Sequence, residues 1–210
     1  WDGFRGTPEL VQRFDYQDNA NPKANEILDK RGIFYDKNRS IDITTSVTGT
    51  FTTEGWSVYK YTNMRSDGRP GSNTTFPDTD FPMFRLADVY LMYAEAVARG
   101  GQGGSMATAV GYVNALRQRA YGDTFHGINE SWLRENDFRN LLDERARELY
   151  WEGTRRTDLI RYGLFASPNY LWTFKGGVLG GVGVDSRYNV FPIPTTDLSV
   201  NGNLRQNEGY

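Results

Sequence analysis

The sequence has no cysteine and only one histidine, His126, among its 210 residues. The lack of cysteine excludes disulfide bonds, thiolate zinc sites and cysteine nucleophiles, and a single histidine excludes a metal site built from several imidazoles. No serine–glycine nucleophile motif and no acidic residue at triad spacing accompany His126. We therefore interpret His126 as a surface-loop residue, and the sequence predicts no metal site and no cofactor.

Long hydrophobic runs are also missing. The best candidate, residues 176–184, is short and mostly glycine, whereas a membrane helix needs roughly 18 consecutive apolar residues. The sequence therefore predicts no membrane-spanning helix. No basic segment leading into an apolar one follows Trp1, so we interpret the sequence as a processed chain or a fragment.

An excess of positive charge is missing as well. There are 24 basic and 26 acidic residues, for a formal net charge of −2. Proteins that bind polyanions usually carry the opposite sign. A nucleic-acid partner is therefore not expected.

Aromatic residues are abundant: 5 Trp, 13 Tyr and 12 Phe. Flat rings stack on the C–H faces of sugar rings, and Asn, Asp and Arg side chains match sugar hydroxyls. Several aromatics fall outside the helical patterns, and the polar segment 65–69 follows some of them. For each ring the alternative role is core filling. The predicted ligand-binding residues are Trp1, Trp56, Tyr59, Arg65, Arg69 and Trp172.

Residues 1–82 are predicted to be rich in loops and strands. Thr7 followed by Pro8 is a helix-start signal, and predicts a short helix with Thr7 as its cap. The alternating pattern from Ile41 to Val47, and the β-rich stretch 56–61, predict two strands. Residues 63–82 contain several Gly and Pro without periodicity and predict an exposed loop.

Residues 83–163 are predicted to form two helical hairpins. Apolar stripes at helical spacing occupy 86–97, 106–116 and 138–149, and a shorter segment includes Leu159 and Ile160. Small residues in the first hairpin are similar to those of tetratricopeptide units. Residues 164–210 are predicted to be irregular. The predicted fold class is thus mainly α, with tetratricopeptide-like hairpins, a loop-rich region and short strands.

The densest charge lies between residues 139 and 161, where six arginines alternate with five acids. Paired carboxylates are what a glycosidase needs, and the candidates are Glu144, Glu148, Glu152 and Asp158. Interleaved arginines hold acids ionised, however, while a general acid needs a raised pKa. We therefore favour an ion-pair scaffold and no catalytic residues, with a glycoside hydrolase and a protein-binding helical scaffold as the alternatives.

Several segments in order resemble blocks of the SusD/RagB family. They are FRLADVYLMYAEA (84–96), VNALRQRA (113–120), DERAREL (143–149), EGTRRTDLIRYG (152–163), FPIP (191–194) and NLRQNEGY (203–210). Glu208 stands where the family usually has proline before the final glycine. The resemblance covers most of this chain and about the C-terminal part of a full member.

The resemblance implies a function that composition does not. Members are non-catalytic lipoproteins on the cell surface of the bacterial outer membrane, which capture glycans or peptides and close over a TonB-dependent transporter. We therefore expect residues 1–210 to be the C-terminal part of a SusD-like domain with a glycan ligand and a transporter partner. Contact with the membrane is expected only through a lipid anchor outside this sequence.

Overall fold

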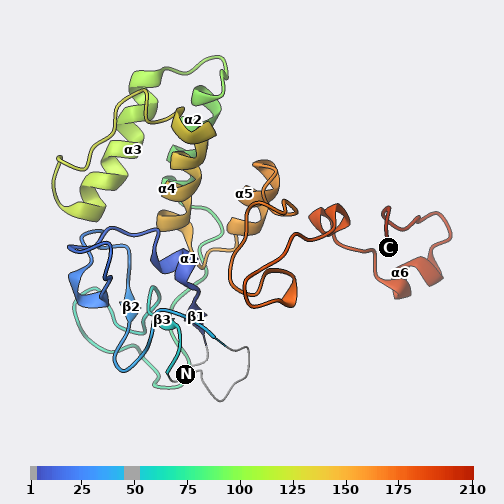
Figure 1. Cartoon of the computed structure of the whole chain (residues 1–210), viewed down its shortest axis with the longest axis horizontal. Helices are drawn as coiled ribbons and strands as arrows, with labels where there is room; N and C mark the ends of the chain where they lie inside the picture. Colours follow the sequence, from blue (N-terminus) through green and yellow to red (C-terminus); the bar gives the residue numbers. More distant parts are fainter. Residues whose placement is uncertain (1–3, 45–52) are drawn as a thin grey trace. The chain divides into compact units, whose positions relative to one another are not determined.

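The computed structural model describes residues 4–44 and 53–210. The chain forms two compact units, Trp1–Arg155 and Arg156–Tyr210 (Figure 1). Each unit is described by itself.

A small antiparallel sheet lies in the first unit. Its strands are β1 (Arg5–Gly6), β2 (Phe34–Tyr35) and β3 (Trp56–Val58), in the order β1-β3-β2. Gly6 is opposite Trp56, and Phe34 is opposite Val58. The prediction of a strand at 56–61 is confirmed for its first residues, whereas β1 and β2 were not predicted because two residues leave no periodic pattern.

The strand predicted from Ile41 is wrong for the residues that can be assessed. Residues 41–44 form no strand, and Thr45 and Val47 lie outside the described residues. The backbone N–H of Thr44 donates to the carboxylate of Glu54 at 2.9 Å. A side chain thus takes the hydrogen bond that a neighbouring strand would otherwise accept.

The first helix, α1 (Pro8–Val11), is short, as predicted. Pro8 occupies the first turn, but the Thr7 side chain makes no capping hydrogen bond. The Thr7 carbonyl instead accepts from the N–H groups of Leu10 and Val11. Val11 of this helix belongs to an apolar cluster that also includes residues of the sheet. The cluster consists of Val11, Phe14, Tyr16, Phe34, Trp56 and Tyr150.

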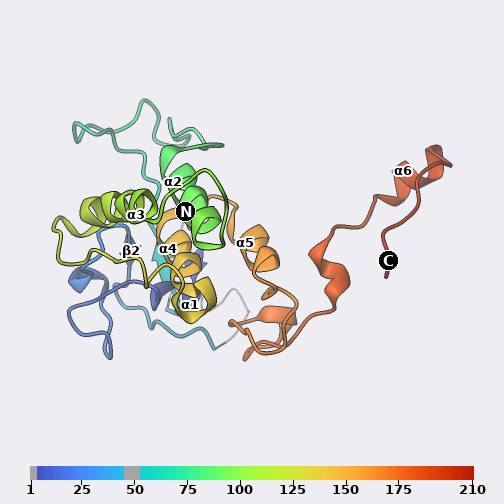
Figure 2. The ribbon, with the colours of Figure 1, turned by 90° about the horizontal axis from the view of Figure 1, so that it is seen from above.

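The first predicted hairpin is confirmed as α2 (Leu86–Ala98) and α3 (Met106–Tyr121). Gly100 has a φ of +93°, which reverses the chain after α2. The Ser105 hydroxyl accepts from the N–H of Thr108 at 3.1 Å and caps α3. Seen from above in Figure 2, α2 and α3 lie beside α4 (Arg139–Leu149), and α2 packs against both.

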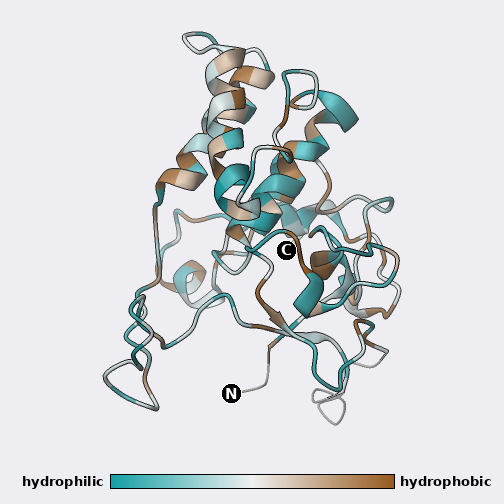
Figure 3. Ribbon diagram, turned by 90° about the vertical axis from the view of Figure 1, so that its left-hand side faces the viewer, coloured by the Kyte–Doolittle hydropathy of each residue, from teal (hydrophilic) through white to brown (hydrophobic). Residues whose placement is uncertain are grey.

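The core of the helical part is built from the predicted stripes. Leu91 and Ala94 of α2, Val113 of α3 and Leu141 of α4 are fully buried in it. Teal and brown residues alternate along these helices in Figure 3. This is the pattern of helices that bury one face each.

The second unit is largely loop. α5 (Arg155–Arg161) begins at the boundary between the units, and α6 (Thr195–Val200) follows near the chain end. The irregular C-terminal region predicted for 164–210 is therefore interrupted by a helix that the sequence analysis missed, since six residues are too few for a helical stripe. In the part of the chain that the structure covers, no helix is both long and apolar enough to cross a bilayer.

Candidate functional site

Trp56, one of the predicted ligand-binding residues, lies in the core. It is only 3% exposed, because β3 is the central strand of the sheet. Its ring centre lies 6.1 Å from that of Tyr16 and 6.2 Å from that of Phe34. The role of Trp56 is core filling, and it has no free ring face to offer a ligand.

Tyr59, in contrast, is exposed. It follows β3 directly and is 49% exposed. Its ring stacks on that of Tyr35, at 5.5 Å between centres and 13° between planes. The two rings hold each other in place, which creates a rigid aromatic surface in contact with solvent.

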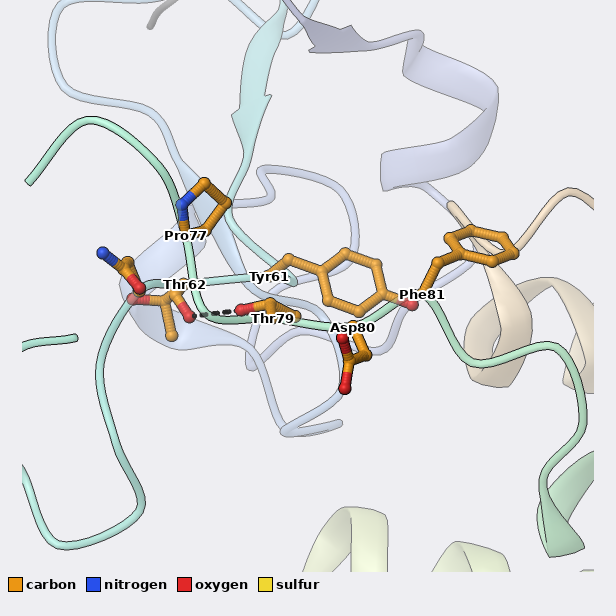
Figure 4. Close-up of a pocket in the computed structure, with 7 residues that line it drawn as sticks. Tyr61, Thr62, Pro77, Thr79, Asp80 and Phe81 are labelled. Carbon is orange, nitrogen blue, oxygen red and sulfur yellow. Dashed lines mark hydrogen bonds between the residues drawn. The ribbon is translucent and has the colours of Figure 1, made fainter. Parts of the chain in front are cut away.

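Tyr61, two residues after Tyr59, lines a cavity of about 230 Å³ (Figure 4). In the figure the Tyr61 ring points toward Phe81, and the Asp80 side chain lies beside it. Partial burial and the negative charge of Glu152 raise the pKa of Tyr61. The complete lining is Tyr61, Thr62, Asn63, Pro77, Thr79, Asp80 and Phe81.

The loop that forms the cavity is the exposed segment predicted at 63–82, and no helix or strand occurs in it. Asn63 holds it together, because its side-chain oxygen accepts from the Asp78 N–H at 3.0 Å and its amide donates to the Asn73 carbonyl at 2.7 Å. Thr79 Oγ1 donates to the Thr62 carbonyl at 3.3 Å (Figure 4). The cavity is thus built by hydrogen bonds within the loop.

The two predicted arginines, Arg65 and Arg69, belong to this loop and are exposed, but neither lines the cavity. Arg69 donates to the Asp67 carboxylate through Nε at 2.8 Å, and this contact lowers the pKa of Asp67. The pKa of Asp78 is lowered mainly by hydrogen bonds from Ser72, and the charge of Arg65 adds to this effect. Both arginines therefore lie apart from Tyr61 and Phe81.

Trp172 belongs to the second unit and is half-buried. The buried ammonium of Lys175 lies 4.6 Å from its ring centre and donates to the carbonyls of Ser167 and Tyr170 at 2.7 and 2.6 Å. Burial lowers the pKa of Lys175. This contact occupies one face of the Trp172 ring. The sixth predicted ligand residue, Trp1, lies outside the described residues.

The glutamates of α4 are buried among arginines. Glu144 is completely buried, and Arg31, Arg117 and Arg147 donate to its carboxylate at 2.7, 2.7 and 2.6 Å. Burial alone would raise the pKa of Glu144, but the guanidinium groups of Arg147, Arg31 and Arg117 outweigh it and hold the pKa far below its usual range. Glu144 is therefore ionised at neutral pH.

Glu148 and Glu152 continue the same network toward the cavity. Arg85 donates to Glu148 at 2.6 Å and to both oxygens of Glu152, through Nε at 2.7 Å and Nη2 at 2.8 Å. Lys60 also pairs with Glu152. Burial opposes ionisation in both glutamates, but these cations prevail and lower the pKa values of Glu148 and Glu152.

The prediction of an ion-pair scaffold is confirmed, with a correction about the partners. Arg147 is the one arginine from the 139–161 cluster that pairs with these glutamates in the described residues. The others come from distant segments and were missed, since nothing in the sequence links them to α4. They are Arg31, Arg85, Arg117 and Arg119.

The environment of these acids does not suit a general acid. A glycosidase acid must be protonated at neutral pH and must reach the scissile bond, whereas Glu144 and Glu148 are buried and ionised. Asp158, the fourth candidate, belongs to the second unit, where Arg161 pairs with it at 2.9 Å. Within residues 4–44 and 53–210, no group of three or more His, Cys, Asp or Glu side chains is arranged to hold a metal ion.

His126 has an acidic neighbour that motif spacing did not reveal. Its Nδ1 lies 2.9 Å from Asp123, and its ring stacks on Tyr121 at 4.0 Å between centres. The Arg117 guanidinium donates to its carbonyl. These contacts fix a half-buried histidine at the end of α3.

The sequence of this chain is similar to sequences of known proteins. The model of the SusD family matches residues 36–210. The chain is 48% identical over 158 residues to the starch-binding protein SusD of Bacteroides thetaiotaomicron, which covers 75% of this chain and 26% of that protein. It is 34% identical over 142 residues to the SusD-like protein P25 of Formosa agariphila, covering 61% of this chain and 24% of that protein. The chain thus spans about a quarter of the length of the curated relatives it matches.

Solved structures agree with this fold. Surface glycan-binding protein A of B. thetaiotaomicron, in complex with laminarihexaose, superimposes with a TM-score of 0.52 at 25% identity, over 74% of this chain and 31% of that chain. A SusD-like protein of Bacteroides fragilis superimposes with a TM-score of 0.63 at 18% identity, over 99% of this chain and 47% of that chain. The predicted fold class is confirmed.

Proposed function

The chain belongs to the SusD family, and from this premise we propose that it binds oligosaccharides or polysaccharides without cleaving them. One relative is named for starch binding, and a structural neighbour was solved with laminarihexaose. Both ligands are neutral glucans. The burial and ionisation of Glu144 and Glu148 also support binding without hydrolysis.

The observation that carries the proposal is the exposed aromatic surface at the end of β3. Tyr59 and Tyr35 present stacked rings to solvent, and Tyr61 lines a cavity two residues later. Rings of this kind pack against the C–H faces of a pyranose, while polar groups beside them receive its hydroxyls. Such a surface is suited to holding a glycan and has no arrangement for cleaving it.

Membership in the family supports a role in nutrient uptake for the whole protein. In this proposal the glycan is captured at the outer surface of the bacterial outer membrane and passed to a TonB-dependent transporter. The buried ion-pair network of α4 then serves as a rigid scaffold beneath the ligand-binding loops. The protein-binding alternative differs in that the chain would retain a protein partner but no glycan.

Affinity electrophoresis tests the proposal. Purified protein should be retarded in gels that contain soluble starch or laminarin, and no reducing sugar should appear on incubation with either glucan. Release of reducing sugar would support a hydrolase instead. Normal migration in both gels, without release of sugar, would refute binding of these glucans.

Tyr59→Ala should weaken glucan binding. The loss of one stacking contact of roughly 0.5–1.5 kcal/mol corresponds to an affinity about 2- to 12-fold lower. The matched control is Tyr188→Ala in the second unit, because Tyr188 is 43% exposed and its ring also pairs with another tyrosine, Tyr210. Equal affinities for the two variants and the parent would remove Tyr59 from the binding surface.

A further inference from the structure

The lining of the Tyr61–Phe81 cavity carries a single charge. Of its seven residues, only Asp80 is an acidic or basic residue that carries a charge at neutral pH. Asp80 is exposed, and in the part of the chain that the structure describes it has no hydrogen bond and no ion pair. Its two oxygens are therefore available as acceptors for a ligand, and its negative charge is not compensated at close range.

The cations near the cavity do not line it. Arg69 is paired with Asp67 within the loop, and Arg65 is not part of the lining. Lys60 lies 5.9 Å from the centre of the Tyr61 ring, but its ammonium pairs with Glu152 and donates to two backbone carbonyls. Among the described residues, no arginine or lysine belongs to the lining of the cavity.

The size of the cavity limits what it holds. At about 230 Å³ it is smaller than the roughly 300–1,000 Å³ of sites that enclose drug-sized molecules. It suits one sugar ring rather than a whole oligosaccharide. Tyr61 and Phe81 contribute apolar groups to the lining, and Asp80 lies beside the Tyr61 ring, where its carboxylate can accept from hydroxyl groups (Figure 4).

We infer that this cavity binds one ring of an uncharged sugar, and that Asp80 makes it select against sugars bearing carboxylate or sulfate groups. The inference rests on the proposed glycan binding and adds the class of glycan and the residue that determines it. A carboxylate on the ligand would lie close to Asp80 without a cation between them. Even in a water-like environment, two like charges about 4 Å apart weaken binding by about fivefold.

The test compares two ligands that differ only at C6, where a neutral hydroxymethyl group is replaced by a carboxylate. One is a soluble β-glucan oligosaccharide and the other is the same oligosaccharide oxidised at C6 to the uronate. Isothermal titration calorimetry at low salt should give an affinity at least about fivefold lower for the oxidised form. The ratio should shrink in 0.5 M salt, because screening reduces repulsion between exposed charges.

The variant Asp80→Asn tests whether Asp80 causes the preference for the neutral oligosaccharide. The amide keeps the size and an acceptor oxygen but removes the charge, so the ratio of the two affinities should fall at least threefold. The control is Asp197→Asn in α6, which changes the net charge equally but is not part of the cavity lining. That variant should keep the parent's ratio.

The outcomes separate the inference from the function it rests on. If the parent binds neither oligosaccharide, the inference is refuted, while the affinity gels with starch and laminarin decide separately whether the proposed glucan binding stands. If the parent binds both forms equally, glycan binding stands and the selectivity is refuted. If the neutral form is preferred but Asp80→Asn keeps the full ratio, the assignment to Asp80 is overturned. Circular dichroism confirms that each variant is folded.

Discussion

At the scale of single residues, Trp56 and Tyr59 lie three positions apart and have opposite environments. Trp56 is on the central strand and is buried by Tyr16 and Phe34. Tyr59 lies just past the strand and is half exposed. Both were predicted to bind ligand because both are aromatic residues outside the helical patterns, in the β-rich stretch 56–61. The sequence could not separate them, since burial depends on Tyr16 and Phe34, which come from other segments.

Trp56→Ala should therefore destabilise the first unit. Removal of a buried tryptophan side chain from a packed core costs about 3–5 kcal/mol in the free energy of unfolding. Urea unfolding followed by circular dichroism measures this loss. Tyr59→Ala, its matched partner, should lower stability by about 1.5 kcal/mol at most, because it removes mainly one exposed ring pair. A loss of stability of the same size in both variants would contradict the contrast in burial.

At the scale of elements, α4 is a helix whose charged face points inward. Glu144 and Glu148 are one helical turn apart and both are buried. The spacing of the acids predicted that they share a face, and the abundance of arginine predicted ion pairing. The identity of the partners required the fold, because Arg31 lies 113 residues before Glu144 in the chain.

Glu144→Gln should be strongly destabilising. It removes the charge that compensates three arginines in a buried site, and breaking a buried ion pair costs about 3–5 kcal/mol. Asp143→Asn is the control on the same helix, because Asp143 also pairs with an arginine, Arg13 at 2.8 Å, but at a partly exposed position. That substitution should cost about 0–1 kcal/mol. Equal midpoints in urea for the two variants would show that the buried network contributes no more than a surface pair.

At the scale of the whole molecule, the ion pairs join segments that are distant in sequence. Arg31 comes from the loop-rich part, Arg85 precedes α2, and Arg117 lies on α3. All three converge on α4 in the first unit. The stability of that unit is thus coupled to the ionisation of the α4 glutamates.

This coupling predicts how stability depends on pH. The pKa values of Glu144, Glu148 and Glu152 are lowered in the folded state. Their contribution is fully present above the unfolded glutamate pKa of about 4.3, and is lost as pH falls below it toward the folded values. Thermal unfolding followed by far-ultraviolet circular dichroism should give a nearly constant midpoint from pH 8 to about pH 5, and a steep fall below about pH 4.5.

The variant Glu148→Gln tests the origin of that fall. It lacks one of the three titrating groups, so its midpoint should be lower at neutral pH but should decline less on acidification. A midpoint of the parent that already falls between pH 7 and 5.5 would point to a group other than these glutamates. Parallel curves for the parent and the variant would exclude Glu148 as a contributor.

The sequence by itself determined the three long helices of the first unit, the turn between the first two and the structural role of the charge cluster. These features depend on neighbours in the chain: apolar residues at helical spacing fix α2, α3 and α4, and Gly100 and Gly122, both with positive φ, follow the ends of α2 and α3. Family membership was also readable, because ordered blocks of residues carry it.

Only the tertiary structure decided which aromatic rings reach solvent, which arginines neutralise the glutamates, and where a cavity forms. The core position of Trp56, the pairing of Arg31 with Glu144 and the uncompensated charge of Asp80 each depend on segments far apart in the sequence. Local patterns record what a residue prefers, whereas burial and charge compensation depend on what the folded chain places around it.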